Sequence, residues 1–208
     1  MPITHLDYLL LAEENEGNIP WMYLDTRGNV TVGIGHLLGD ADEAAELPFV
    51  AGRAGRPAAA ADIVAGHAAV RRARRLATRG AGAFRGLTDL RLPEASVLAL
   101  YERDFNAILG YTRDAFRSVG GGFDSYPPAA QLAVLDMAFN LGARGLYRRF
   151  PRFREHGLGR RDFATAAREC RRTGISASRN DRTRDLLLEA ARAEADAGLS
   201  PSAPAMLG

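Results

Sequence analysis

The chain opens with a helical hydrophobic pattern. In the segment HLDYLLLAEEN the leucines recur at intervals of three and four residues, which predicts a helix over residues 5–15. Thr4 stands just before this segment and Asp7 follows three residues later, a spacing that resembles a capping box with Asp in place of Glu. The pattern therefore predicts the helix and also where it begins.

The pattern changes from helical spacing to alternation after Glu16. Residues 21–25 (WMYLD) and 30–35 (VTVGIG) have the period of two that is typical of strands. Gly28 and Asn29, which lie between the two segments, are common in tight turns. A β-hairpin is therefore expected directly after the first helix.

Residues 41–90 carry weaker signals. They are rich in Ala, Gly and Arg, and the segment 57–80 predicts one or two short helices with weak amphipathicity. Low complexity and flanking glycines indicate an insertion or a linker between two lobes.

Helical signals are clearer from Leu92 onward. Leu92-Pro93-Glu94 predicts a helix with Pro in its first turn. Gly120–Gly122 marks a break, and the segment after Pro127-Pro128 is apolar almost all round, as expected of a helix in the centre of a lobe. Two more helices are expected at about 160–172 and 180–196. In the helix that begins near Pro93, the residues expected to form the buried stripe are Val97, Leu98, Tyr101, Phe105 and Ile108.

Together these elements predict an α+β, mostly helical fold in a single domain with two lobes and a cleft between them. The small N-terminal lobe (residues 1–40) contains a helix and a β-hairpin, and residues 41–90 form the insertion. The larger C-terminal lobe (91–196) is all helical, and residues 197–208 form a tail.

Composition agrees with a globular domain. Of the 208 residues, 47% are hydrophobic and 25% are charged, which is enough to bury a core. No apolar run reaches the roughly 18 residues of a membrane span, and we find no signal-peptide pattern at the N-terminus. The single cysteine, Cys170, excludes an intramolecular disulfide and is expected to be a buried small residue. A monomeric protein made in the cytoplasm, without stable membrane insertion, is expected.

The basic residues have an unusual composition. All 27 are arginine, and the net charge is +2. A GC-rich genome explains the missing lysines, but arginine at this density also favours polyanionic partners such as nucleic acid or an anionic cell wall. Arg71, Arg72, Arg74 and Arg75 are interpreted first as a solvated helix face.

Two carboxylates and a hydroxyl stand at the ends of the first predicted elements. Glu16 ends the helix, Asp25 ends the first strand and Thr31 lies in the second strand. By the period of two, Tyr23 and Asp25 share a face, and the turn can bring Thr31 beside them. Glycoside hydrolysis needs two such carboxylates, one to protonate the leaving oxygen and one to activate water or attack the sugar.

The spacing of these residues resembles that of the phage T4-type lysozymes, the muramidases of glycoside hydrolase family 24. That family carries Glu, then Asp or Cys nine positions on, then Thr six further, followed by G-x-G-H; here the motif runs from Glu16 to His36. DMAFNLG (136–142) and SASRNDRTRDLL (176–187) are similar to the central helix and the Arg-containing segment of the family. The resemblance covers about residues 1–40 and 92–190, whereas residues 42–88 depart from it.

The resemblance implies a lysozyme-like two-lobed fold and a role for each matching residue. Glu16 would be the general acid, Asp25 would activate a water and Thr31 would hold that water. An inverting reaction is expected, with the carboxyl groups about 6.5–9.5 Å apart. Arg182 would pair with Glu16 and orient it, so we expect the acid to gain its proton only in the substrate complex.

Further positions match the family less specifically. Leu37, Phe139 and Asn140 correspond to residues that line the substrate cleft, although Leu37 and Phe139 are equally typical of a core. His36 is expected to hydrogen-bond the backbone and fix the hairpin to the catalytic helix. The glycines of G-x-G-H are interpreted as sites where sugar or backbone approaches the strand closely.

Several remaining residues have less specific interpretations. Trp21 and Tyr23 are candidates for stacking on sugar or for packing in the lobe core. His5, His67 and His156 lack the spacing of metal ligands, and no metal or organic cofactor is expected.

The function expected from the resemblance is hydrolysis of the β-1,4 bond between N-acetylmuramic acid and N-acetylglucosamine in the glycan strands of peptidoglycan. A lytic transglycosylase and an inactive wall-binding module are the alternatives, while nucleic-acid binding lacks interleaved aromatics and a motif. The enzyme would reach periplasmic peptidoglycan as a phage endolysin released by holins, on a phage tail, or as a secreted toxin. An immunity protein is an expected partner in the toxin case.

Overall fold

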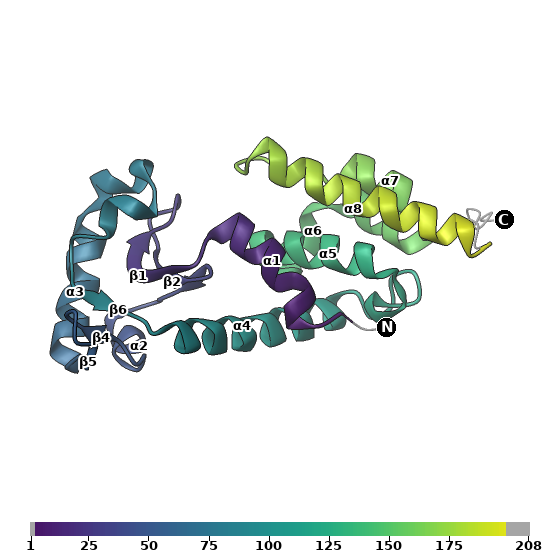
Figure 1. The fold of residues 1–208 in the computed structure, drawn as a ribbon. Helices are drawn as coiled ribbons and strands as arrows, with labels where there is room; N and C mark the ends of the chain where they lie inside the picture. The colour runs from purple at the N-terminus through teal and green to yellow at the C-terminus, as the bar shows by residue number, and fades with distance from the viewer. Residues whose placement is uncertain (1–2, 199–208) are drawn as a thin grey trace. The chain divides into compact units, whose positions relative to one another are not determined.

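A computed structural model describes residues 3–198, apart from the side chains of residues 10, 11 and 13–16. Figure 1 shows helices throughout the chain and small antiparallel sheets in its first half. The expected mostly helical α+β class is therefore confirmed. Part of the expected tail, residues 199–208, lies outside the described residues.

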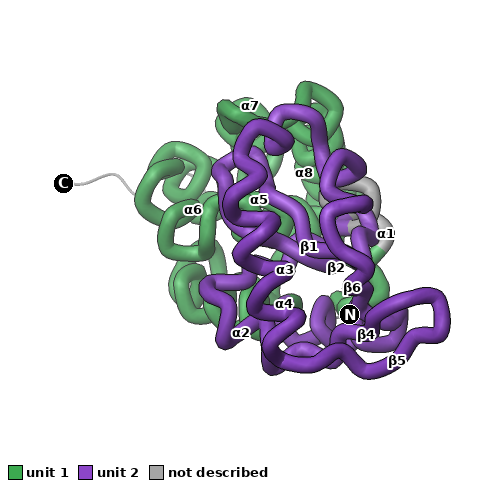
Figure 2. Tube along the Cα trace, turned by 90° about the vertical axis from the view of Figure 1, so that its left-hand side faces the viewer, with its two compact units in different colours: residues 1–9, 105–208 green, residues 10–104 purple. Residues whose placement is uncertain are grey.

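The chain divides into two compact units (Figure 2). Unit 1 consists of residues 1–9 and 105–208, and unit 2 consists of residues 10–104. Helices α1 (His5–Glu16) and α4 (Glu94–Ala115) each contribute residues to both units. Residues 41–90, interpreted as an insertion, belong to unit 2 together with the hairpin.

The capping box predicted at the start of α1 is present. The backbone N–H and the hydroxyl of Thr4 both donate to Asp7 Oδ2, at 2.7 and 2.8 Å. The backbone N–H of Asp7 donates back to Thr4 Oγ1 at 3.4 Å. The hydrogen bond from the Thr4 backbone is the largest of the effects that lower the pKa of the Asp7 carboxyl.

Unit 2 contains the predicted hairpin and a third strand. β1 (Ile19–Leu24), β2 (Val30–Gly33) and β3 (His36–Leu37) form an antiparallel sheet in that order. The strand expected over residues 30–35 ends early, because Gly33 and Gly35 have φ angles of 65° and 76° and the chain turns there into β3.

A second small sheet in unit 2 was not predicted from the sequence. β4 (Val50–Ala51) lies between β5 (Arg56–Pro57) and β6 (Leu90–Arg91). α2 (Ala41–Ala45) precedes β4, and the residues between β5 and β6 form α3 (Ala60–Arg72) and the 3₁₀ turns η1 (Arg74–Arg79) and η2 (Ala81–Phe84). The helices expected within 57–80 are therefore confirmed, and α3 packs against β1 and β2 (Figure 1).

Trp21 on β1 packs against the segment that follows α3. Its indole Nε1 donates to the carbonyl of Ala81 at 2.9 Å, and the guanidinium groups of Arg85 and Arg91 lie 5.5 and 5.3 Å from the ring centroid. These contacts give Trp21 the structural role that was one of its two interpretations.

Helix α4 begins directly after Pro93, and most of its predicted buried stripe is confirmed. Val97, Tyr101 and Phe105 are buried. Leu98 was wrongly included, since it is 38% exposed. One residue advances a helix by about 100°, so Leu98 points away from the face that Val97 buries.

Unit 1 is built around α5 (Pro128–Leu141), whose residues are buried along almost its whole length. It packs against α6 (Ala143–Arg149) and α8 (Ala177–Asp196), and α7 (Phe163–Glu169) also packs on α8, as Figure 1 shows. The central position expected for this apolar helix is confirmed. Short turns η3 (Phe123–Ser125), η4 (Phe153–Gly157) and η5 (Leu158–Arg160) connect the helices.

A buried ion cluster joins α5 to α8 and to the connection before α8. Asp136 on α5 is 1% exposed, and its Oδ2 accepts hydrogen bonds from Arg172 at 2.6 Å and from the Thr183 hydroxyl at 2.9 Å. Its Oδ1 accepts from Nε of Arg179 at 3.0 Å. The amide of Asn180 completes the cluster, because it bonds to both the N–H and the carbonyl of Arg172.

Replacing the central carboxylate tests the importance of this cluster. Asp136→Asn leaves the Arg172 guanidinium buried without its counter-charge, so we expect a loss of about 3–5 kcal/mol in the free energy of unfolding. Asp181→Asn, which breaks an exposed pair with Arg184, is the control and should cost less than about 1 kcal/mol. Urea unfolding followed by far-ultraviolet circular dichroism measures both, and equal effects would contradict the assignment.

The capping box makes a pH-dependent contribution to stability. Because the pKa of Asp7 is lowered in the folded chain, its contribution is present above the unfolded pKa of about 3.9 and is lost as the pH falls through the folded value. The difference in melting temperature between wild type and Asp7→Asn should therefore shrink as the pH falls from about 5 to about 2. The control is Asp89→Asn, at another exposed position. Its difference in melting temperature from wild type should not depend on the hydrogen bonds between Thr4 and Asp7.

Candidate functional site

The carboxylate of Asp25 is held by the turn that connects β1 and β2. Its Oδ1 accepts from the backbone N–H groups of Arg27 and Asn29, at 2.9 and 2.8 Å, and its Oδ2 accepts from Asn29 Nδ2 at 3.0 Å. Gly28, whose φ of 82° favours glycine, donates its N–H to the Asp25 carbonyl at 3.0 Å. The turn residues therefore determine the orientation of this side chain.

The same bonds limit what the carboxylate of Asp25 can do. An ionised carboxylate offers about four acceptor sites, and three of them are used by Arg27 and Asn29. About one site therefore remains, on Oδ2, to accept a proton from a water or a substrate hydroxyl. Such a carboxylate suits orienting a water better than moving toward a substrate.

Thr31 lies in the middle of a row of residues that crosses the sheet. It pairs with Tyr23 on β1 and with Leu37 on β3, so all three side chains share one face. Thr31 is 2% exposed and its hydroxyl donates to the Asn29 carbonyl at 3.3 Å, whereas Leu37 is 52% exposed. The expected proximity of Thr31 and Tyr23 is confirmed, and Leu37 joins them.

Glu16 is the last residue of α1, and its side chain lies outside the described residues. Gly17, with a φ of 73°, and Asn18 connect it to β1. The general acid expected at Glu16 therefore stays a prediction.

His36 connects β3 to α4. Its Nδ1 lies 2.6 Å from Oδ2 of Asp104, and Arg103 Nη2 lies 3.5 Å from its Nε2. In place of the expected backbone partner, the structure gives His36 a carboxylate on α4. Attachment to the helix that ends at Glu16 stays a prediction, because the side chains of residues 13–16 lie outside the described residues.

The structure gives Gly33 a positive φ of 65°, which favours glycine, and a Cβ at this position would lie 3.2 Å from Cγ1 of Val97 on α4. The turn and the packing of α4 therefore both favour glycine here. The close approach of a sugar to this strand stays a prediction.

The other predicted residues belong to unit 1. Phe139 is half-buried and stacks on Tyr8, with ring centroids 4.9 Å apart and an interplanar angle of 18°. Asn140 is half-buried near the end of α5, and Arg182 on α8 lines a pocket of about 580 Å³ together with Asp181 and Asp185. The pairing of Arg182 with Glu16 stays a prediction.

Sequence reasoning identified Asn29 only as a turn residue and did not single out Asp104. Asn29 follows Gly28 in the turn, and Asn is well known to bond carboxylates and backbone locally, so this partner of Asp25 could have been found. Asp104 stands 68 residues after His36 without a local signal. The expected burial of Cys170 is confirmed, and burial raises the pKa of its thiol.

Among the side chains that the structure describes, no three His, Cys, Asp or Glu residues gather as a metal site would require. None of the described helices is long and apolar enough to cross a membrane.

Comparison with known proteins adds no assignment. No protein-family model matches the chain, and no curated protein matches it.

The turn around Asp25 can be tested with a pair of glycine substitutions. A Cβ at Gly28 or at Gly86 would contact nothing within 4 Å, so the two sites differ chiefly in the positive φ of Gly28. Gly28→Ala should lower the free energy of unfolding by about 1–2 kcal/mol, whereas Gly86→Ala should change it by less than about 1 kcal/mol. Urea unfolding checks both, and equal values would show that the turn tolerates alanine.

Proposed function

We propose that the protein is a peptidoglycan muramidase with a lysozyme-like arrangement of two lobes. It would hydrolyse the β-1,4 bond between N-acetylmuramic acid and N-acetylglucosamine. The observation that supports this best is the cross-strand row of Tyr23, Thr31 and Leu37 beside the fixed carboxylate of Asp25. These residues follow closely after the helix that ends at Glu16.

The hydrogen bonds around Asp25 and Thr31 suit the positioning of a water molecule. Asp25 Oδ2 keeps about one acceptor site, and the Thr31 hydroxyl keeps its lone pairs because it donates to the Asn29 carbonyl. A water that donates one proton to each residue turns a lone pair toward the sugar. Water attack on the face opposite the leaving group would invert the anomeric carbon.

In the proposed reaction, Glu16 supplies the proton for the leaving glycosidic oxygen. Asp25 takes the proton of the attacking water, so the water oxygen forms the new bond as the glycosidic bond breaks. Arg182 would orient Glu16, and desolvation by the bound glycan would raise the pKa of the acid. No step requires a metal or an organic cofactor.

Two alternatives give different products. A lytic transglycosylase needs an acid but no water-holding pair, and it leaves anhydro ends. An inactive wall-binding module would release no fragments. The presence of both Asp25 and Thr31 favours the hydrolase. The proposed substrate lies outside the bacterial membrane, so delivery by phage lysis or by a secretion system is part of the proposal, with an immunity protein as partner in the second case.

Digestion of purified peptidoglycan tests the function. Wild type should release fragments with reducing muramic-acid ends, identified by mass spectrometry. Glu16→Gln should lower the rate by about 10²–10⁴-fold or more, because it removes the general acid. Glu46→Gln, at an exposed position on unit 2, is the matched control and should keep full activity. Anhydro ends would support the transglycosylase, and no release by wild type would contradict both enzymes.

A further inference from the structure

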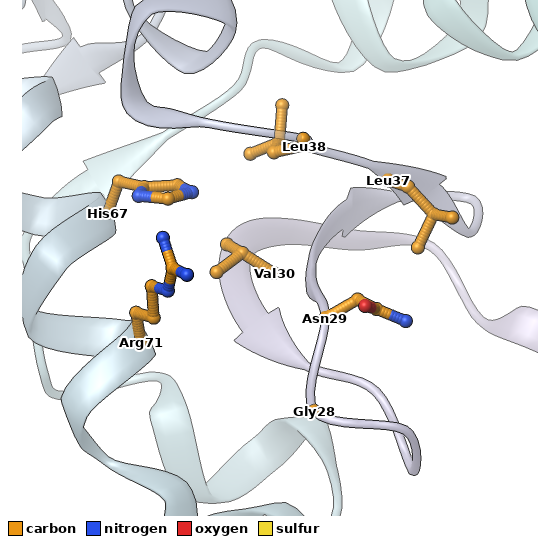
Figure 3. A pocket seen from close by; sticks show the side chains of 8 residues that line it. Gly28, Asn29, Val30, Leu37, Leu38, His67 and Arg71 are labelled. Carbon is orange, nitrogen blue, oxygen red and sulfur yellow. The ribbon is translucent and has the colours of Figure 1, made fainter.

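A pocket of about 180 Å³ lies within unit 2, between α3 and the hairpin (Figure 3). Val30 and Leu38 form the apolar lining near α3, where Arg71 supplies a positive charge and His67 an imidazole. It lies on the side of the hairpin that faces α3, and the proposed hydrolysis uses neither His67 nor Arg71.

His67 brings a ring nitrogen without a hydrogen-bond partner to this pocket. The residue is 3% exposed, and its Nε2 has no hydrogen-bond partner among the described residues. Burial lowers the pKa of the imidazole, and the neighbouring backbone of Leu38 acts in the opposite direction. A neutral ring that donates through Nδ1 keeps an acceptor lone pair on Nε2. In Figure 3 the far end of the ring points toward Val30 and Leu38.

Arg71 adds a positive charge one helical turn after His67. It is exposed, and the described residues offer it no ion-pair partner. Figure 3 shows its guanidinium rising along the same side of α3 toward the imidazole. Residues four apart on a helix are neighbours on its surface, so one small ligand can reach both groups.

These groups define the chemistry of a ligand. Nε2 needs a hydrogen-bond donor, Arg71 needs an anion, and Val30 and Leu38 need a small apolar group. A bare inorganic anion lacks the donor and the apolar part, and a neutral sugar lacks the charge. The last residue of an acylated peptide has all three within a few bonds, because its amide N–H, its side chain and its carboxylate are attached to one carbon.

We propose that this pocket binds the carboxyl-terminal residue of a short acylated peptide with a small side chain. The carboxylate pairs with Arg71, the last amide N–H donates to Nε2 of His67, and the side chain packs on Val30 and Leu38. The source of the peptide rests on the proposed function, since peptidoglycan carries short peptides that end in D-alanine. The binding chemistry does not depend on glycan cleavage.

Nuclear magnetic resonance with the full chain tests the site, with N-acetyl-D-alanine as the probe. Because Val30 and Leu38 flank the end of the ring, binding should shift their methyl signals and the Nε2 signal of His67. Affinity in the millimolar range is expected for so small a ligand. N-acetyl-D-alaninamide, which lacks the carboxylate, and acetate, which lacks the amide, should each bind at least about tenfold more weakly.

Substitutions distinguish binding in this pocket from a general attraction of the anionic probe to arginine side chains. Arg71→Gln should weaken probe binding by about tenfold or more, whereas Arg72→Gln, an exposed neighbour outside the pocket, should not change it. His67→Phe should remove the response as well. Equal effects of the two arginine variants, or equal binding of the amide, would overturn the proposal, as would the absence of any shift.

Two further comparisons distinguish this proposal from the proposed function. Glu16→Gln should bind the probe like wild type even though it does not digest peptidoglycan, so failure of one proposal leaves the other standing. N-acetyl-L-alanine should bind more weakly than the D isomer. Equal binding of the two isomers would overturn the assignment to cell-wall peptides.

Discussion

Three hydrogen bonds from the turn at residues 27–29 hold the carboxylate of Asp25 at the end of β1. The closed turn also sets the register of the sheet, in which Tyr23, Thr31 and Leu37 form one row. A shift of one residue would move Thr31 to the opposite face. The arrangement of candidate side chains on unit 2 therefore depends on one short turn.

Features whose interacting residues are close in sequence could be predicted. Thr4 and Asp7 lie within one turn, Gly28 and Asn29 form a tight turn, and the apolar character of α5 is continuous. The strands β4, β5 and β6 have two residues each, which is too short for a periodic pattern. β4 pairs with β6 about forty residues later, so only the folded chain reveals that sheet.

In the candidate site, too, contacts between residues close in sequence could be predicted, whereas contacts between distant residues could not. The register of Thr31 against Tyr23 follows from the turn, and it was expected from the alternation of the two strands. The partner of His36 lies on α4, and the packing of Gly33 depends on Val97 of the same helix, so neither was accessible to local reasoning. The same is true of His67, whose surroundings come from β2 and β3. In each case a contact distant in sequence determines the role of the residue.

The position of Trp21 gives the chain a built-in spectroscopic probe. It is the only tryptophan in the sequence, and its contacts with Ala81, Arg85 and Arg91 all belong to unit 2. Indole fluorescence therefore reports on the surroundings of one unit alone, while the far-ultraviolet signal comes from the helices of both. A comparison of the two signals during denaturation distinguishes concerted loss of structure from separate melting of the units.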